Sequence, residues 1–492
     1  MFSKDRFLLF FVLIILAGVM RFSHLGTWSF AMDELFTPIE AHVLMGEMDV
    51  PEEYLEGGKQ QEQTQLYRLP RALFVAYFIH WVDYKLFGED EFGSRILVAV
   101  IGSLNIGIIF AVACPLFGTR GSLILSLLIM LFPEHLLNSQ NNRFYCISFL
   151  LITVVFLLGG YIVQKRSVTA AVWIGPLAVL MVFSHTLGGL IWGILLAGIF
   201  LDFVFSSKNK NEKYPVRIFV LIGIWSLLLV LIAFFYLKPI LWDWNFEDRQ
   251  WGYTPFHSAA ALVNRIGWSF TLLSCFGTVL LLTDWRNKGN IYWTVCVVMS
   301  LLAVFLLPLK TTFYPWYCFL FSFPIFVAVS LGINRIYFLL VRADFPYYRL
   351  VGNFWISMAL LLNFPSFVSY YLDGNRLDYR SSCQHIREHW QKEDCITADN
   401  IQITEYYLSD LTPVIPLRAK NTPEFLQELA EKKKGKGRIW IIVHHHRNGL
   451  DQHLLHWLGR FASYEAQFRK KRFDYIENNV EVFLVPRKET PQ

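Results

Sequence analysis

Charged residues are scarce in this chain of 492 residues: Asp, Glu, Lys and Arg together make up 17% of it, against about 25% in a typical soluble domain. Hydrophobic residues account for 54%, and the mean hydropathy is +0.39. This shortage of charge excludes a soluble enzyme of this size and indicates a protein that crosses a membrane several times. The net charge of +5 is spread over short loops between apolar runs, so it predicts no nucleic-acid partner.

Three other signals are missing. The seven cysteines include no pair with C-x-x-C spacing, the usual pattern of a zinc or redox site. No internal repeat is evident. The first apolar run, 7–22, is preceded by Lys4 and Arg6 but followed by no small-residue cleavage site, so we expect a retained helix and not a signal peptide. Cys383 and Cys395 lie in a polar tail and could pair if that tail is extracytoplasmic; their spacing alone leaves this open.

Long apolar runs, in contrast, recur along the first three-quarters of the chain. Eleven of them, with their flanks, are long enough to cross a bilayer. These are 7–22, 94–114, 121–137, 146–163, 168–183, 187–205, 217–237, 266–283, 291–308, 315–333 and 350–369. A further run, 70–87, has a heavy polar load for a lipid-facing span. Its polar residues are Arg71, His80, Asp83 and Lys85.

The distribution of Lys and Arg decides how the run 70–87 is placed. If this run does not cross and the N-terminus is cytoplasmic, the basic loops fall on the cytoplasmic side, as expected for a membrane protein. Those loops carry Lys4, Arg6, Arg120, Lys165, Arg166, Lys208, Lys210, Lys213, Arg217, Arg286, Lys288, Arg335, Arg342 and Arg349. We therefore predict about eleven transmembrane helices in a domain over 1–372. Residues 23–93 form one external loop, with a helix along the membrane surface.

The tail, 373–492, is charged and mixed in character. Strands are predicted by apolar runs at 395–399, 438–443 and 480–485, and helices by the patterns at 422–434 and 451–461. Alternating strands and helices indicate a small α/β domain. An odd number of spans places this domain outside the cytoplasm.

Two adjacent acids, Asp33 and Glu34, follow the first span, behind the aromatic residues Trp28 and Phe30. A solvated loop would explain two acids equally simply. Inside a roofed cavity at the membrane boundary, however, their pKa values would be raised and they would be suited to proton abstraction.

Further polar elements follow other spans in a fixed order. They are Arg68-Leu69-Pro70, the segment 86–95 from Leu86-Phe87-Gly88 to Arg95, Asn141-Asn142-Arg143-Phe144-Tyr145, Ser184-His185 and Tyr314-Pro315-Trp316-Tyr317. With the acidic pair, this order resembles the GT-C superfamily of membrane glycosyltransferases. Within it, the chain is similar to the bacterial branch of lipid A aminoarabinose transferases and relatives of protein O-mannosyltransferases. Tyr145 and Leu69 stand where the aminoarabinose transferases have an acid and a lysine.

The resemblance implies an inverting transfer of a sugar from a polyprenyl-phosphate donor to an acceptor hydroxyl of a lipid, glycan or protein. Asp33 would be the base and Glu34 would stabilise or orient the sugar. The leaving phosphate needs cations and hydrogen-bond donors. Its predicted partners are Arg68, Arg249, Tyr317, Arg143, His185 and Lys310. Since two such side chains neutralise a monophosphate, we expect no obligatory metal, although Asp33 and Glu34 could hold Mg²⁺ or Mn²⁺.

Simpler roles remain open for several of these residues. Arg143 and Tyr145 could be interfacial anchors, and His185 could be a packing residue at a helix end. Tyr145 and Trp242 could contact the sugar or acceptor, and interfacial anchoring explains Trp242 equally well. Glu134 and the adjacent His135 are also expected to be interfacial.

Two other functions compete with transfer. A transporter or lipid flippase would be expected to have internal repeats and ionisable groups deep in its spans. A membrane scaffold without activity would leave the acidic pair unexplained. We therefore expect a multi-pass enzyme of the inner membrane.

Overall fold

The structure is a computed structural model that describes most of the chain. The described residues are 4–30, 32–49, 70–206, 215–238, 254–285, 287, 289–309, 313–342, 347–362, 364–373, 377–417, 437–444, 458–460, 462–470 and 478–486. The chain divides into two compact units. One, called the membrane unit, comprises 1–23, 38–89 and 93–367; the other, called the C-terminal unit, comprises 24–37, 90–92 and 368–492.

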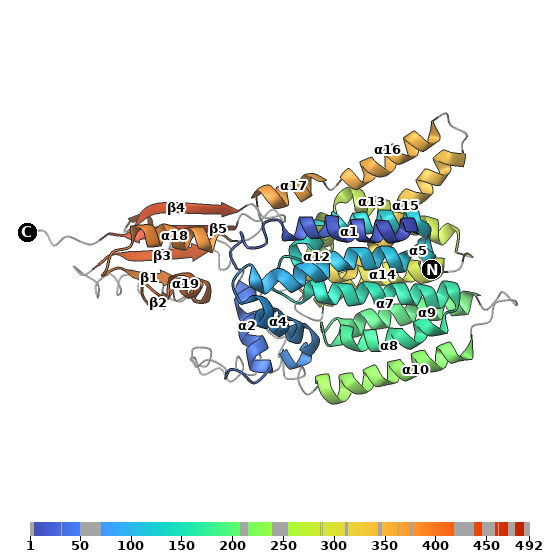
Figure 1. Ribbon diagram of the computed structural model, residues 1–492, viewed down its shortest axis with the longest axis horizontal. Coiled ribbons are helices and arrows are strands. Elements are labelled where there is room, and N and C mark those ends of the chain that lie inside the picture. The colour runs from blue at the N-terminus through green and yellow to red at the C-terminus, as the bar shows by residue number, and fades with distance from the viewer. Residues whose placement is uncertain are drawn as a thin grey trace, which may run out of the picture. The chain divides into compact units, whose positions relative to one another are not determined.

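The membrane unit is a helical bundle, and Figure 1 shows many of its helices running side by side. Its α-helices are α1 (Lys4–Phe22), α4 (Phe74–Phe87), α5 (Ile96–Met130), α6 (Pro133–Asn138), α7 (Tyr145–Lys165), α8 (Val168–Val182), α9 (Gly188–Ser206), α10 (Val216–Leu231), α12 (Pro255–Ile266), α13 (Trp268–Thr283), α14 (Asn290–Leu306), α15 (Ser322–Arg342) and α16 (Tyr348–Leu361). Helices α2 (Met32–Leu44) and α17 (Phe364–Asp373) contain the division between the units.

Shorter helical turns complete the membrane unit. They are the 3₁₀ turns η2 (Gly93–Arg95), η5 (Leu307–Leu309) and η6 (Pro315–Phe321), and the π-helix η3 (Ile232–Leu237).

Six helices in the described part of the chain are long and apolar enough to cross a membrane, or up to eight if two bent helix pairs each count as one span. The protein is thus a multi-pass membrane protein, but the predicted count of eleven is not confirmed. One bent pair, α12 and α13, turns by 99°. Its break lies at Gly267, where φ is +93° and a side chain would be strained.

Helix α5 is continuous from Ile96 to Met130 by its bounds, but it consists of two arms, because the chain reverses direction within it. Asn105 Nδ2 lies 3.1 Å from His135 Nε2. A straight helix from residue 105 to 130 is about 38 Å long, and five more residues reach back at most about 17 Å. The bend lies at Gly118, which has φ +72°. The two arms agree with the separate apolar runs at 94–114 and 121–137.

Helices approach most closely where glycine faces a neighbouring backbone. Gly277 of α13 lies against α15, where a Cβ atom would overlap the carbonyl oxygen of Ala328. Such small-residue contacts let membrane helices gain dispersion energy that lipid tails would otherwise supply.

Helix α4 confirms a helix in the run 70–87. Its polar residues His80 and Asp83 are buried, whereas Phe74 and Phe78 are 44% and 39% exposed. His80 and Asp83 therefore point into the protein, whereas Arg71 and Lys85 and the two apolar rings are exposed, as suits a helix at a membrane surface. Asp83 accepts a hydrogen bond from the backbone N–H of Leu97, in the first turn of α5, and burial raises the pKa of its carboxyl to about 7.

The C-terminal unit confirms the small α/β domain. Its sheet has the strand order β2-β1-β3-β5-β4, parallel from β2 to β3 and antiparallel beyond. The elements are α18 (Tyr379–His389), β1 (Cys395–Ala398), α19 (Ile401–Leu408), β2 (Val414–Pro416), β3 (Ile439–His444), β4 (Ser463–Lys470) and β5 (Asn478–Val485). The predicted strands correspond to β1, β3 and β5. The predicted helix 422–434 lies outside the described residues, as does 451–461 except for 458–460.

The two faces of this sheet are both buried, because neighbouring residues of a strand point to opposite faces. One apolar cluster contains Cys383 of α18 with Ile396 and Trp440, and the other contains Cys395 with Ile441. Both thiols are free. The two cysteines thus form no disulfide, which answers the question that their spacing left open.

Candidate active site

The structure describes only part of the predicted site. Arg68, Arg249, Lys310 and Trp242 lie outside the described residues, and Asp33 is described in its backbone only, as the second residue of α2. The predicted convergence of these groups with the acidic pair therefore stays a prediction.

Glu34 is fully buried in the C-terminal unit. Leu35, the next residue, packs against the core of the C-terminal unit. Glu34 and Leu35 are therefore both part of the interior of that unit.

A second acid on α2, Glu40, anchors a polar cluster in the membrane unit. Its Oε2 accepts a hydrogen bond from the Tyr77 hydroxyl at 2.6 Å and lies 3.6 Å from Arg143 Nη1. Glu40 is 6% exposed. Burial, and next the charge of Glu40, raise the pKa of Tyr77 well above its usual value. Tyr77 thus stays a hydrogen-bond donor, and the charge of Arg143 is balanced by Glu40.

Aromatic rings continue this cluster toward η6. The ring centroid of His185 lies 5.4 Å from that of Phe144, 5.8 Å from that of Tyr145 and 5.5 Å from that of Tyr317. The residues come from α7, from η6 and from the loop between α8 and α9. The structure thus brings together four residues predicted for the site, namely Arg143, Tyr145, His185 and Tyr317.

His185 is a neutral group here. Its Nδ1 accepts a hydrogen bond from the backbone N–H of Leu187 at 3.1 Å, which places the ring proton on Nε2. Burial and, to a lesser extent, the charge of Arg143 lower the pKa of His185 to about 3. His185 can therefore donate one hydrogen bond to a ligand, but it supplies no positive charge.

Two buried residues that the sequence placed at the interface are part of this end of the bundle. Glu134, 4% exposed, forms an ion pair with Arg265 of α12, and His135 Nδ1 lies 2.7 Å from Arg21 Nη2. Arg21 and His135 are both fully buried. Both side chains are therefore held inside the bundle by partners more than a hundred residues away along the chain, and no local pattern indicates such contacts. That they lie at the level of the membrane interface stays a prediction.

Glu40 was also missed, but a local signal exists. It follows Asp33 by seven residues, a spacing that puts two residues on one face of a straight helix. Pro38, between them, lies inside α2 and hides this pattern because it normally ends a helix.

An apolar cavity of about 700 Å³ lies beside the cluster, between α9, α10 and η3. It is lined by Val182, Thr186, Gly189, Trp192, Leu196, Ser226, Leu229, Val230, Ala233, Leu237 and Lys238. Thr186, one of the lining residues, directly follows His185 in the chain. The π-helix η3 supplies two of the lining residues, and π-turns inside helices are frequent at functional sites.

The described residues contain no group of three or more His, Cys, Asp or Glu that could hold a metal ion. The Asp33 side chain is not among them, so the expectation about Mg²⁺ or Mn²⁺ stays open.

Several glycosyltransferases of known structure share this fold. ArnT from Cupriavidus metallidurans, bound to undecaprenyl phosphate, has a TM-score of 0.52 and 12% identity, over 100% of both chains. The oligosaccharyltransferase of Archaeoglobus fulgidus, tethered with an acceptor peptide, has a TM-score of 0.51 and 12% identity, over 93% of this chain and 72% of that one. Arabinofuranosyltransferase AftD from Mycobacteria has a TM-score of 0.50 and 13% identity, over 98% of this chain and 42% of that one.

These three proteins are GT-C superfamily enzymes, and the chain has the GT-C fold that its motifs predicted. No protein-family model and no curated protein sequence matches the chain.

Proposed function

We propose that this protein is an inverting glycosyltransferase. It moves a sugar from a polyprenyl-phosphate donor to an acceptor hydroxyl at the extracytoplasmic membrane face. The observation that carries the proposal is the apolar cavity whose lining residue Thr186 directly follows His185 of the polar cluster. A prenyl phosphate has one long apolar end and one charged end, and it needs an apolar space close to polar groups. The binding of undecaprenyl phosphate by ArnT, which has the same fold, supports the same donor class.

The proposed reaction needs one base and one charge-stabilising site. The carboxylate of Asp33 takes the proton of the acceptor hydroxyl, whose oxygen attacks the anomeric carbon from the face opposite the phosphate. The bond between the anomeric carbon and the phosphate oxygen breaks, and polyprenyl phosphate leaves with the bonding electrons. Attack from the opposite face inverts the configuration at that carbon.

The leaving phosphate is stabilised by positive charge and by hydrogen-bond donors. Arg68, Arg249 and Lys310 are assigned the positive charge, and the Tyr317 hydroxyl and His185 Nε2–H are assigned the neutral hydrogen bonds. Because Glu40 already balances the charge of Arg143, Arg143 has an orienting role within the cluster.

Donor consumption by the full-length protein tests this proposal. Purified protein in lipid nanodiscs is incubated with a panel of polyprenyl-phosphate sugars and hydroxyl acceptors, and the product and its anomeric configuration are determined. Asp33→Asn is expected to lower transfer about a hundredfold or more with normal membrane insertion. Asp49→Asn, at an exposed acid of the same predicted loop, serves as the control with normal transfer.

Two results would refute parts of the proposal. Transfer by Asp33→Asn at the wild-type rate would remove Asp33 from the mechanism. Transport of intact donor lipid across the membrane without any covalent product would favour the flippase alternative, which would also use an apolar cavity.

A further inference from the structure

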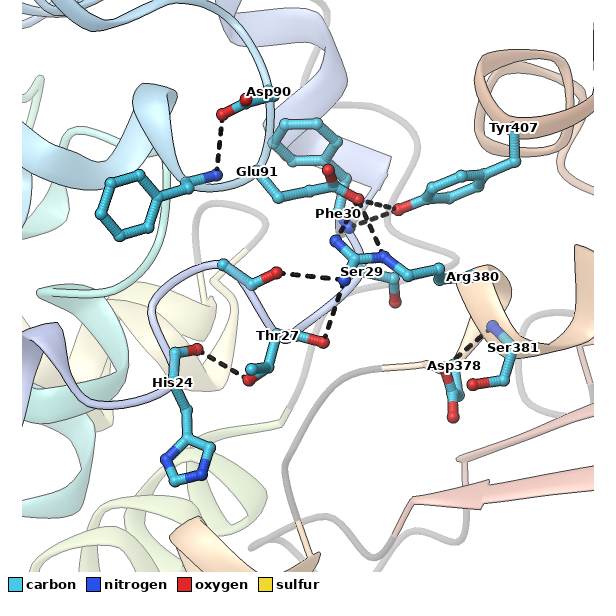
Figure 2. A network of polar contacts seen from close by, with 12 residues as sticks. His24, Thr27, Ser29, Phe30, Asp90, Glu91, Asp378, Arg380, Ser381 and Tyr407 are labelled. Atoms are coloured by element: carbon cyan, nitrogen blue, oxygen red, sulfur yellow. Dashed lines mark hydrogen bonds and ion pairs between the residues drawn. The ribbon is translucent and has the colours of Figure 1, made fainter. Parts of the chain in front are cut away.

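A polar network inside the C-terminal unit joins three segments that lie far apart in the sequence (Figure 2). Its centre is the carboxylate of Glu91, from the short segment 90–92. Glu91 Oε1 accepts a hydrogen bond from Arg380 Nε at 3.2 Å and another from the Tyr407 hydroxyl at 2.7 Å. Arg380 belongs to α18 and Tyr407 to α19, so both donors come from the α/β domain.

The same two side chains also hold the backbone just ahead of the acidic pair. Arg380 Nη1 donates to the carbonyl oxygens of Gly26 at 3.0 Å and Thr27 at 3.4 Å. The Tyr407 hydroxyl accepts a hydrogen bond from the backbone N–H of Phe30 at 3.2 Å. Figure 2 shows the guanidinium of Arg380 between Glu91 and the loop at Thr27.

Apolar and backbone contacts strengthen the attachment. The Ser29 hydroxyl donates to the carbonyl oxygen of Leu377, and the rings of Phe30 and Tyr406 lie 5.2 Å apart in an edge-to-face arrangement. Phe30 is 1% exposed, and Leu35 packs against the core of the α/β domain. Contacts with the C-terminal segment therefore lie on both sides of Asp33 along the chain: at Phe30, three residues before it, and at Leu35, two residues after it.

The Glu91 side chain is only 13% exposed, so its hydrogen bonds to Arg380 and Tyr407 are formed away from most of the water. Charge-assisted hydrogen bonds in such surroundings are about twice as strong as neutral ones. If Arg380 is lost, the largely buried carboxylate of Glu91 keeps only the Tyr407 hydroxyl as a donor, and the carbonyl groups of Gly26 and Thr27 lose the Arg380 donor. Losing a donor to a largely buried carboxylate is costlier than losing an exposed ion pair. The network thus attaches residues 26–30 and Glu91 to helices α18 and α19, and it is more than a set of incidental surface contacts.

We propose that Arg380 and Tyr407 are positioning residues for the transfer reaction, because they fix the backbone of residues 26–30 directly ahead of Asp33. The inference rests on the proposed function, in which Asp33 is the base. The α/β domain is then a part of the catalytic apparatus and not a separate binding module. A base must lie within hydrogen-bond reach of the hydroxyl that it deprotonates, and a misplacement of about 1 Å can cost a hundredfold in rate.

The test compares Arg380→Ala and Tyr407→Phe with the wild type as full-length protein in nanodiscs. Amide hydrogen exchange of peptides covering 26–35 is expected to rise in both variants. Arg380→Ala removes the donor to the carbonyl oxygens of Gly26 and Thr27, and Tyr407→Phe removes the acceptor of the Phe30 amide. In transfer assays kcat is expected to fall about tenfold or more while the donor KM changes by less than about twofold. Asp410→Asn is the matched control. This substitution breaks the ion pair between Asp410 and Arg387. Arg387 lies on α18, as Arg380 does, but Asp410 contacts neither Glu91 nor residues 26–30.

Three results would overturn the proposal. These are unchanged exchange over 26–35, a kcat no lower than that of Asp410→Asn, and a raised donor KM with normal kcat, which would indicate donor binding instead. If Arg380→Ala does not fold, Tyr407→Phe, which removes one oxygen atom, decides the matter. If the wild type transfers no sugar from any donor, the proposed function fails. The exchange data then still decide whether these residues fix the segment.

Discussion

At the scale of single residues, several buried charges in the membrane unit occur in pairs. Glu40 lies by Arg143, and Glu134 pairs with Arg265. Where water is largely excluded, removing one partner leaves the other without compensation and costs about 3–5 kcal/mol, whereas removing both can be nearly neutral. The effect of a substitution at these positions therefore depends on whether its partner is still present.

A double-mutant cycle at Glu40 and Arg143 measures this dependence. Glu40→Gln and Arg143→Gln are each expected to lower the thermal unfolding midpoint, because each leaves an unpaired charge. The double variant is expected to lose less than the sum of the single effects, by about 1 kcal/mol or more. Tyr77→Phe, which removes a hydrogen bond from Glu40 but no charge, is the control. Additive losses would show that the two charges do not interact.

These pairs also mark what the sequence could not predict about the site. Position and residue type indicated that Arg143, Tyr145, His185 and Tyr317 would be near one another, and the structure brings them together. The sequence did not indicate that Arg143 is paired or that His185 is neutral. The neutrality of His185 depends on its burial and on the charge of Arg143. The pairing of Arg143 depends on Glu40, a partner 103 residues away along the chain.

At the scale of elements, hydropathy alone located most of the membrane helices. The runs 146–163, 187–205 and 291–308 correspond to α7, α9 and α14 within a few residues. Hydropathy separated the two arms of α5 but did not predict the other helix breaks. The run 121–137 contains Pro133, where α6 begins after α5 has ended at Met130. Breaks depend on single backbone conformations, which leave the mean hydropathy of a run unchanged.

The cavity beside α10 gives the element-scale prediction. Ala233 of η3 lines it, so Ala233→Trp fills space that a prenyl chain would occupy. Each excluded methylene costs about 0.8 kcal/mol, so kcat/KM for an undecaprenyl-linked donor is expected to fall about tenfold or more. A farnesyl-linked donor is expected to lose much less, since its short chain needs less of the cavity.

Val220→Trp adds the same bulk to α10 at a position that is 54% exposed and outside the cavity lining. It is expected to leave both donors unaffected. Equal losses for long and short donors in Ala233→Trp would show that the cavity does not hold the prenyl chain.

At the scale of the whole molecule, the α/β domain is assembled from three segments of the chain. Composition predicted a separate domain after the last span. It did not predict that 24–37 and 90–92 belong to the same unit. The chain has 44 Lys and Arg and 39 Asp and Glu residues, and nothing in their order indicates that Arg380 pairs with Glu91. Such pairings depend on the tertiary fold.

The membrane orientation is the whole-molecule prediction. Basic loops predict a cytoplasmic N-terminus and an extracytoplasmic α/β domain. Of the native cysteines only Cys275 is exposed, so single exposed cysteines can be introduced into a Cys275→Ser background. Lys392→Cys, in the α/β domain, is expected to react with a membrane-impermeant maleimide in intact spheroplasts. Lys165→Cys, at the C-terminal end of α7, is expected to react only after permeabilisation. The opposite pattern would place Asp33 on the cytoplasmic side and exclude transfer at the outer face.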